Sequence, residues 1–406
     1  MVIISAPWIV PVDTPVVRNG GIAAVDGRII DIGKREDIVL KYPQFPVTSY
    51  PCVLMPGLVN AHMHLELSHL KNTIEPVANQ SFTDWIDSLI EIRAAKEYSL
   101  DTIVDSFTTA LQDQHNAGVA LIGDIGNEYY GELHLLKEDF QPRVCRMLEY
   151  LGPNLNACEL ALEKIEQLDD SVSVTGHAPY STAPELLQKI KRRCNRLKHL
   201  FSIHTCESRD EREFIRSGTG SFRRFLEKKK SWDGVFSFAV SGHLNTIEYF
   251  DYLNLLDDKT LLVHCVHLSQ NDLQLIRKRG SKICLCPGSN QFLDVGLAPV
   301  EQIVELGLLP ALGTDSPASN QRTDIWREMQ LLVENHANLK PSDVLAMATL
   351  GGASALLQDA DFGCLSVGKI AKFIHVSSGS LERCSDTNQL IEELVSGGQP
   401  RDIEWV

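Results

Sequence analysis

The sequence predicts an α/β protein, in which a (β/α)8 (TIM) barrel is accompanied by a small β-sandwich domain built from both chain ends. From about residue 54, eight short apolar runs recur, and each ends in a polar cluster. The polar markers lie 25 to 28 residues apart, with two larger steps of 60; they are His64, Asp124, Glu149, His177, His204, His264, Ser289 and Asp315. The shorter step holds one strand, one loop and one helix. Because TIM-barrel active sites lie at the carboxyl ends of the strands, these clusters mark the expected site.

The chain ends have a different pattern. Residues 1–50 contain β-type runs broken by Gly and Pro, and the segment GCLSVGKIAKFIHVSSG returns to β-type alternation near the C-terminus. We therefore expect residues 1–53 and 360–406 to form one split β-sandwich domain, with the barrel over 54–359. The two longer steps leave room for lids around 81–94 and 208–250.

Composition narrows the classes of partner. The chain has 406 residues, with 38 Lys and Arg against 53 Asp and Glu, for a net charge of −15. Polyanions recruit basic surfaces, so nucleic acid and anionic membranes are not expected as partners, whereas a small-molecule substrate is. No apolar run reaches the roughly 18 residues of a membrane helix, and the apolar N-terminus lacks a basic start. We expect a cytoplasmic protein whose ten scattered cysteines are reduced, with a homodimer as the default assembly.

Four side chains at strand ends predict a metal site. His62 and His64 stand two residues apart, so in a strand both imidazoles share one face. An HxH pair can also be two ordinary buried histidines. However, His204 and Asp315 close two other predicted strands, and together the four give an N3O ligand set. That set suits one divalent metal ion, with Zn²⁺ the first choice and Fe²⁺ an alternative, and it leaves a position for water.

Two further residues are candidates for proton transfer. Glu207 lies three residues beyond His204, so its carboxylate can stand beside the metal and accept or donate a proton. In HCVH, His264 and His267 face opposite ways along a strand, so only one can enter the site. His264 is closer to the end of the apolar run and is the predicted catalytic residue. His267 is expected to make a structural hydrogen bond.

Together the motifs resemble a known family. HxH after PGLVNA, HxxE at 204–207, HCVHLS, CPGSNQFLDVGLAP and LGTDSPASN are similar to motifs of the amidohydrolase superfamily, in its mononuclear deaminase and chlorohydrolase branch. The resemblance implies metal binding by His62, His64, His204 and Asp315. It also implies proton transfer by Glu207, His264 and Asp315.

The resemblance bears on three more residues. Binuclear members carry a carboxylated Lys at the end of strand 4, where this chain has His177, so one metal is expected. In the resembling deaminases a histidine there contacts substrate, although a structural role for His177 stays open. Glu149 ends strand 3, the strand from which amino-sugar deacetylases of the superfamily take a metal ligand. Glu66, in HLELS, is expected near the substrate or, alternatively, as a cap of the next helix.

HLELSHL, FTDW and EYLG look most like the aminodeoxyfutalosine deaminase subgroup. The resemblance therefore implies release of ammonia from an aminopurine-type ring, with 6-amino-6-deoxyfutalosine of menaquinone biosynthesis as the specific substrate. Deamination of adenosine, S-adenosylhomocysteine or guanine, dechlorination and amide hydrolysis are the alternatives. A non-enzymatic scaffold is a further one, but such relatives typically lose metal ligands. Two departures bear on substrate choice, since Gly288 replaces a basic residue of the related CPRSN and Pro317 follows TDS.

Overall fold

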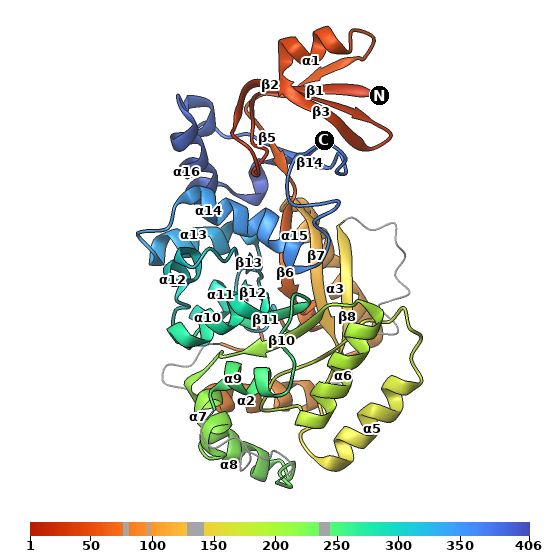
Figure 1. Ribbon diagram of the computed structural model, residues 1–406, viewed down its shortest axis with the longest axis vertical. Coiled ribbons are helices and arrows are strands. Elements are labelled where there is room, and N and C mark those ends of the chain that lie inside the picture. Colours follow the sequence, from red (N-terminus) through yellow and green to blue (C-terminus); the bar gives the residue numbers. More distant parts are fainter. Residues whose placement is uncertain (76–80, 96–97, 128–141, 235–243) are drawn as a thin grey trace.

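The computed structural model describes residues 1–75, 81–95, 98–127, 142–234 and 244–406 (Figure 1). Strands from both chain ends join in one small sheet. Its order is β15-β14-β5-β1-β2-β3, and β4 pairs with β1. The strands are β1 (Val2–Ile9), β2 (Val17–Val25), β3 (Arg28–Lys34), β4 (Val47–Ser49), β5 (Val53–Pro56), β14 (Phe373–Val376) and β15 (Ile403–Trp405). The pairing gives one seven-stranded sheet rather than two, so the β-sandwich and its exact boundaries stay a prediction.

Eight parallel strands form two four-stranded sheets below it. One holds β6 (Leu58–Met63), β7 (Val119–Gly126), β8 (Arg143–Tyr150) and β9 (Val174–Gly176); the other holds β10 (Phe201–Thr205), β11 (Thr260–His264), β12 (Lys282–Leu285) and β13 (Ala311–Leu312). Where β9 and β10 bring the edges of the two sheets together, the N–H of His204 donates to His177 O at 3.0 Å. Where β13 and β6 do the same, the N–H of Asp315 donates to His62 O at 3.0 Å. These bonds suit the predicted barrel and bring the ends of four strands together.

Helices follow most strands. They are α1 (Arg35–Lys41), α3 (Leu100–Asn116), α5 (Leu155–Glu166), α6 (Pro184–Leu197), α10 (Gln270–Arg279), α11 (Pro287–Phe292), α12 (Val300–Glu305), α13 (Ile325–Asn335), α14 (Pro341–Ala346), α15 (Gly352–Ala355) and α16 (Thr387–Gly397), with short turns η3 (Met347–Gly351), η4 (Leu381–Arg383) and η5 (Pro400–Asp402). Side-chain oxygens cap the first turns of several of them, for example Ser99, Asn154, Ser269 and Asp324. Among the described helices, none is both long and apolar enough to span a bilayer.

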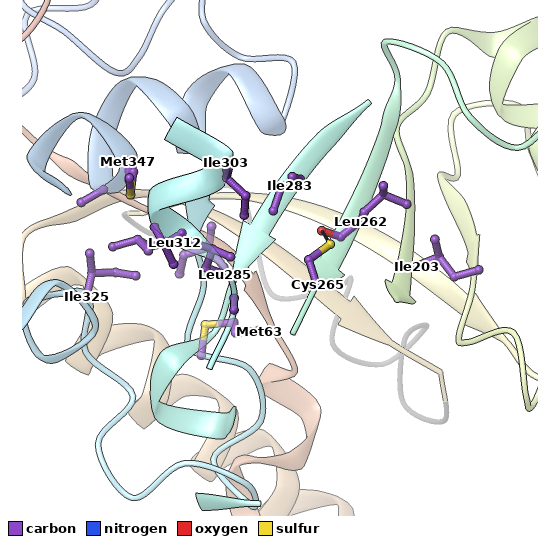
Figure 2. Packing of buried hydrophobic residues seen from close by; sticks show 14 of the residues in the cluster. Met63, Ile203, Leu262, Cys265, Ile283, Leu285, Ile303, Leu312, Ile325 and Met347 are labelled. Atoms are coloured by element: carbon purple, nitrogen blue, oxygen red, sulfur yellow. Dashed lines mark hydrogen bonds between the residues drawn. The ribbon is translucent and has the colours of Figure 1, made fainter. Parts of the chain in front are cut away.

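Along the strands, successive buried side chains belong to two different hydrophobic clusters. Leu262 on β11 packs in one cluster with Ile203 of β10 and Leu285 of β12, whereas its neighbours Leu261 and Val263 belong to a second cluster. Figure 2 shows part of the first cluster, including Ile203, Leu262 and Leu285 from adjacent strands. Each such buried side chain contributes about 1.5–3 kcal/mol to folding. The strand ends are therefore held on a rigid scaffold.

The two 60-residue intervals, after His64 and after His204, contain extra helices at the end of the molecule far from the small sheet (Figure 1). After β6 come η1 (Leu65–Leu70) and α2 (Phe82–Ala95); after β10 come α7 (Arg209–Ser217), α8 (Ser221–Lys228) and α9 (Thr246–Tyr252). The Phe222 ring of α8 stacks on Tyr180, with ring centroids 3.9 Å apart, and lies 6.0 Å from Phe82 of α2. Asp87 of α2 forms an ion pair with Lys228 of α8. The two predicted lids thus contact each other, although residues 235–243 of the second lie outside the described residues.

Candidate active site

His62 and His64 lie at the end of β6 and are both buried. The pairing of β6 with β7 shifts register between Asn60 and Met63, an irregularity of the kind that re-aims side chains beside active sites. His64 donates from Nδ1 to Ile125 O at 3.1 Å, so its Nε2 carries the lone pair. Neither ring nitrogen of His62 has a hydrogen-bond partner among the described residues. Burial lowers the pKa of His62 to about 4, which keeps the ring neutral and able to bind a metal.

Asp315 follows β13 and faces both of these histidines. Its Oδ1 lies 3.5 Å from His62 Nε2 and 3.4 Å from His64 Nε2. The hydroxyls of Ser289 and Ser319 donate to its other oxygen, Oδ2, at 2.6 and 2.8 Å. Burial alone would raise the pKa of Asp315, but the nearby histidine rings hold it well below its usual range. The carboxylate is therefore ionised, oriented and left with one oxygen for a cation.

His204 completes the set on β10. One nitrogen each from His62, His64 and His204 lies within 4.8 Å of the other two. His264 donates from Nδ1 to Asn290 Oδ1 at 3.0 Å, so its Nε2 accepts from His204 Nδ1 at 3.1 Å. His204 Nε2 is then the nitrogen left with a lone pair, and it is buried with no partner among the described residues. Unpartnered buried nitrogens beside an ionised carboxylate fit one divalent cation, since burying such groups without a partner is costly.

A second cluster shares His204. Glu149, His177 and His204 also bring ligand atoms within 4.8 Å of one another. Because His204 has only Nε2 available, it can serve one ion and not two. Because Asp315 Oδ1 also lies 3.5 Å from His62 Nε2 and 3.4 Å from His64 Nε2, the geometry favours a single metal at the cluster of His62, His64, His204 and Asp315.

Glu207 stands beside the metal cluster. Its Oε1 lies 3.5 Å from His264 Nε2, and its Oε2 lies 3.8 Å from His204 Nδ1 without a hydrogen-bond partner among the described residues. Burial, together with the charge of Asp315, raises the pKa of Glu207 well above its ordinary value. This shift favours the protonated form of Glu207, the form that can donate a proton. His267, the other candidate in HCVH, belongs to none of the clusters of potential metal ligands among the described residues.

The backbone at the strand ends is unusual. Cys206, His264, Cys265 and Asp315 have φ values of 51°, 73°, 54° and 58°, in the left-handed region that residues other than Gly rarely adopt. Such conformations persist only where surrounding contacts hold them, and they gather at functional sites. Here they turn the chain sharply just as it leaves β10, β11 and β13.

Three predicted substrate-side residues line the neighbouring strands. Glu66 in η1 accepts from the N–H of Asn127 at 2.9 Å, and Glu149 accepts from the Asn127 side chain at 3.2 Å. A side chain at Gly126 would come within 2.7 Å of Glu66 Oε2, so the glycine permits this approach. His177 lies close to His204, with ring centroids 4.9 Å apart. The structure thus brings Glu66, Glu149 and His177 to one side of the candidate metal site.

Several residues at the site were not singled out from the sequence. Ser319, Asn290 and Asn127 orient Asp315, His264 and Glu149 through the hydrogen bonds described above. Tyr180 also borders the site, since its ring centroid lies 5.8 Å from that of His177. The motifs CPGSN, PASN and GHAPYS already contain Asn290, Ser319 and Tyr180, so their position at strand ends was the available signal.

A (β/α) fold whose strand ends gather three histidines, an aspartate and a buried glutamate is the arrangement typical of metal-dependent hydrolases. The chain belongs to the amidohydrolase family, whose model matches residues 53–402. It is accordingly a hydrolase of the kind that acts on carbon–nitrogen bonds.

Known proteins are similar over most of the chain. An adenosine deaminase of Helicobacter pylori is 28% identical over 350 residues, covering 82% of this chain and 81% of that protein. An aminodeoxyfutalosine deaminase of Nitratiruptor sp. is 28% identical over 372 residues, covering 86% and 85%. A zinc-bound adenosine deaminase structure from Xanthomonas campestris matches with a TM-score of 0.79 at 21% identity, covering 99% and 90%. This last likeness concerns the fold.

Proposed function

We propose that the chain is a metal-dependent deaminase that hydrolyses the exocyclic amino group of an aminopurine-type ring and releases ammonia. The observation that carries this proposal is the buried carboxyl of Glu207, 3.5 Å from His264 Nε2 and 3.8 Å from His204 Nδ1, beside the cluster of His62, His64, His204 and Asp315. A hydrolase that cleaves a ring amidine needs a metal-activated water on one side and a proton donor for the ring nitrogen on the other. The cluster and Glu207 supply these two parts.

The residues divide the proton transfers between them. A divalent ion, Zn²⁺ first and Fe²⁺ as the alternative, supplies a water nucleophile at neutral pH when bound. Asp315, which is ionised, accepts a proton from the attacking water, and His264 orients that water. Glu207 gives its proton to the ring nitrogen next to the amine-bearing carbon. A carbon–oxygen bond forms and the carbon–nitrogen bond breaks. Asp315 returns its proton to the amino group, which leaves as ammonia, and the proton of the new hydroxyl passes to Glu207, which leaves a ring carbonyl and restores the Glu207 carboxylic acid.

The specific substrate we propose is 6-amino-6-deoxyfutalosine, the intermediate of menaquinone biosynthesis. The Nitratiruptor relative supports it, together with the HLELS and EYLG segments, whose Glu66 and Glu149 both accept hydrogen bonds from Asn127. We propose that Glu66, Glu149 and His177 contact the purine nucleoside, with carboxylates accepting from hydroxyl groups.

Ammonia release tests the proposal. Purified protein loaded with zinc is assayed against 6-amino-6-deoxyfutalosine, adenosine, S-adenosylhomocysteine, methylthioadenosine and guanine, with metal content measured on the same sample. We expect about one equivalent of metal and the highest kcat/KM with 6-amino-6-deoxyfutalosine. No ammonia from any aminopurine, in a sample that holds the metal, would refute the proposed function.

The second candidate is deamination of adenosine itself. The Helicobacter relative, described as an adenosine deaminase, favours it as strongly as the Nitratiruptor relative favours the first. The same panel separates the two, because a higher kcat/KM with adenosine than with 6-amino-6-deoxyfutalosine selects the second candidate.

A further inference from the structure

The loop that carries Glu207 is held by a second glutamate. Glu211, in the first turn of α7, is fully buried at 0% exposure. Its Oε1 accepts from the N–H of Cys206 at 2.7 Å and from the hydroxyl of Thr246 at 2.8 Å. Its Oε2 accepts from the N–H of Glu207 at 3.2 Å. One carboxylate therefore fixes two successive peptide N–H groups at the point where the chain leaves β10.

This arrangement differs from ordinary helix capping. Ser208 is the N-cap of α7 and accepts from the N–H of Glu211 at 3.1 Å, so the sequence SRDE begins as a capping box does. In a capping box the third-residue glutamate reaches back to the N–H of the N-cap residue. Glu211 instead bonds to the N–H groups of the two residues before Ser208. Its bonds therefore constrain the loop as well as the helix start.

The buried position of Glu211 is costly for a structural cap. Burial raises the pKa of this carboxyl to about 7, even though its hydrogen bonds favour the charged form. Solvent-exposed carboxylates cap helices without that cost. Thr246, at the start of α9, donates its hydroxyl to Glu211 Oε1 from a separate helix. The contacts fix Glu211 between the second lid and the loop.

The backbone of the loop needs such support. Cys206 has a φ of 51°, in the left-handed region, so the peptide before Glu207 adopts a turn that a non-glycine residue rarely takes. The turn sets where the Glu207 carboxyl lies, 3.5 Å from His264 Nε2 and 3.8 Å from His204 Nδ1. We propose that Glu211 is the positioning residue for Glu207, holding the turn at Cys206 so that the Glu207 carboxyl faces the reacting ring. The role of Glu207 in this inference rests on the proposed function.

Substitution at two glutamates of the same helix tests the inference. Glu211→Gln keeps the size of the side chain but turns an NH₂ group toward one of the two peptide donors. Glu213→Gln makes the same change of charge two residues away at an exposed position, and it is the matched control. We expect Glu211→Gln to lower kcat by about 10- to 100-fold, because small displacements of catalytic groups are costly. KM and the bound metal should change by less than about 3-fold, as uniform substrate binding is untouched. Glu213→Gln should behave as the wild type.

Hydrogen exchange provides a readout that does not depend on turnover. Peptides containing the Cys206 and Glu207 amides should exchange about 10-fold faster in Glu211→Gln than in the wild type. The same peptides should be unchanged in Glu213→Gln. If Glu211→Gln fails to fold, Glu211→Asp takes its place, since it keeps the charge but is too short to reach both N–H groups.

Two results would overturn the inference: wild-type exchange of these amides in the Glu211 variant, or a kcat within about 2-fold of the wild type. A kcat loss that only tracks loss of metal would also overturn it. If the wild-type protein deaminates no aminopurine, the proposed function fails, and the exchange measurement alone decides whether Glu211 holds the loop.

Discussion

Glu328 offers a direct test of how this protein stabilises the loops around its site. It lies on α13, fully buried, where its Oε2 accepts from the N–H of Gly288 at 2.7 Å and its Oε1 accepts from the Asn320 side chain at 2.8 Å. It thus ties the first turn of α11, which follows β12, to the loop that follows Asp315. Burial raises the pKa of Glu328 from 4.5 to about 8, although both hydrogen bonds act in the opposite direction.

The sign of the effect on stability follows from this shift. The folded protein keeps the Glu328 proton over a pH range in which the unfolded chain has released it. The contribution of this group to stability is therefore fully present below about pH 4.5 and is lost as pH rises through about 8. One pKa unit corresponds to about 1.4 kcal/mol, so the whole loss amounts to about 5 kcal/mol. Most of it should fall between about pH 5 and 8.

Glu328→Gln removes this titration. The variant carries a pH-independent cost, because an amide NH₂ replaces one acceptor oxygen. Relative to the wild type, however, it should gain stability steadily from pH 5 to pH 9, by up to about 4 kcal/mol. Urea-unfolding midpoints of the two chains, measured at equal metal loading, give the difference at each pH, and groups common to both chains cancel. Glu334→Gln changes an exposed glutamate of the same helix, paired with Arg327, and is the control for the replacement of Glu by Gln away from the site. A difference between Glu328→Gln and the wild type that does not change with pH would refute the reasoning.

Two further predictions concern the metal cluster. Glu207→Gln should keep about one equivalent of metal while lowering kcat by about 10²- to 10⁴-fold, because it removes the proton donor and no metal ligand. Assays of ammonia release and metal content check this, and loss of metal in the variant would contradict the role assigned to Glu207. Treatment with a chelator should lower Tm, because His62 and Asp315 are left buried without a cation. Added Zn²⁺ should restore the stability of the fold by RT ln(1 + [Zn²⁺]/Kd). An unchanged Tm after verified removal of the metal would count against the site.

The strand-end residues could be predicted because the fold is periodic. Parallel strands of a β/α unit end on one side, so polar residues recurring at strand–helix–strand spacing must meet in space. His62, His204 and Asp315 are far apart in the chain, but each follows a buried strand, and the structure brings them within a few ångströms of one another. The family and the hydrolytic class of the chain, inferred from the same motifs, are confirmed by the match over residues 53–402.

Contacts that cross between loops could not be predicted in this way. From the sequence, Gly288 in CPGSN replaces a basic residue of related chains, and its effect on substrate choice stays a prediction. In the structure, a Cβ at this position would come within 2.5 Å of Glu328 Oε1 and 2.6 Å of Asn320. The glycine therefore permits a close approach of the backbone to a buried carboxylate. Nothing in the spacing of the sequence indicates that a glutamate 40 residues later on a helix lies against this loop.

Glu211 and Glu328 show why a sequence pattern finds ligands more easily than the residues that hold them. Both are glutamates on amphipathic helices, where an exposed carboxylate is the ordinary expectation. Both are instead buried and accept from backbone N–H groups of loops that carry catalytic or ligand-orienting side chains. A buried carboxylate is tolerated only where several donors converge on it, and for each of these two one donor lies far along the chain: Thr246 for Glu211 and Gly288 for Glu328. Their positions therefore depend on the assembled tertiary structure. For the same reason, substituting either residue should disturb a loop at the site while leaving the metal-binding side chains themselves unchanged.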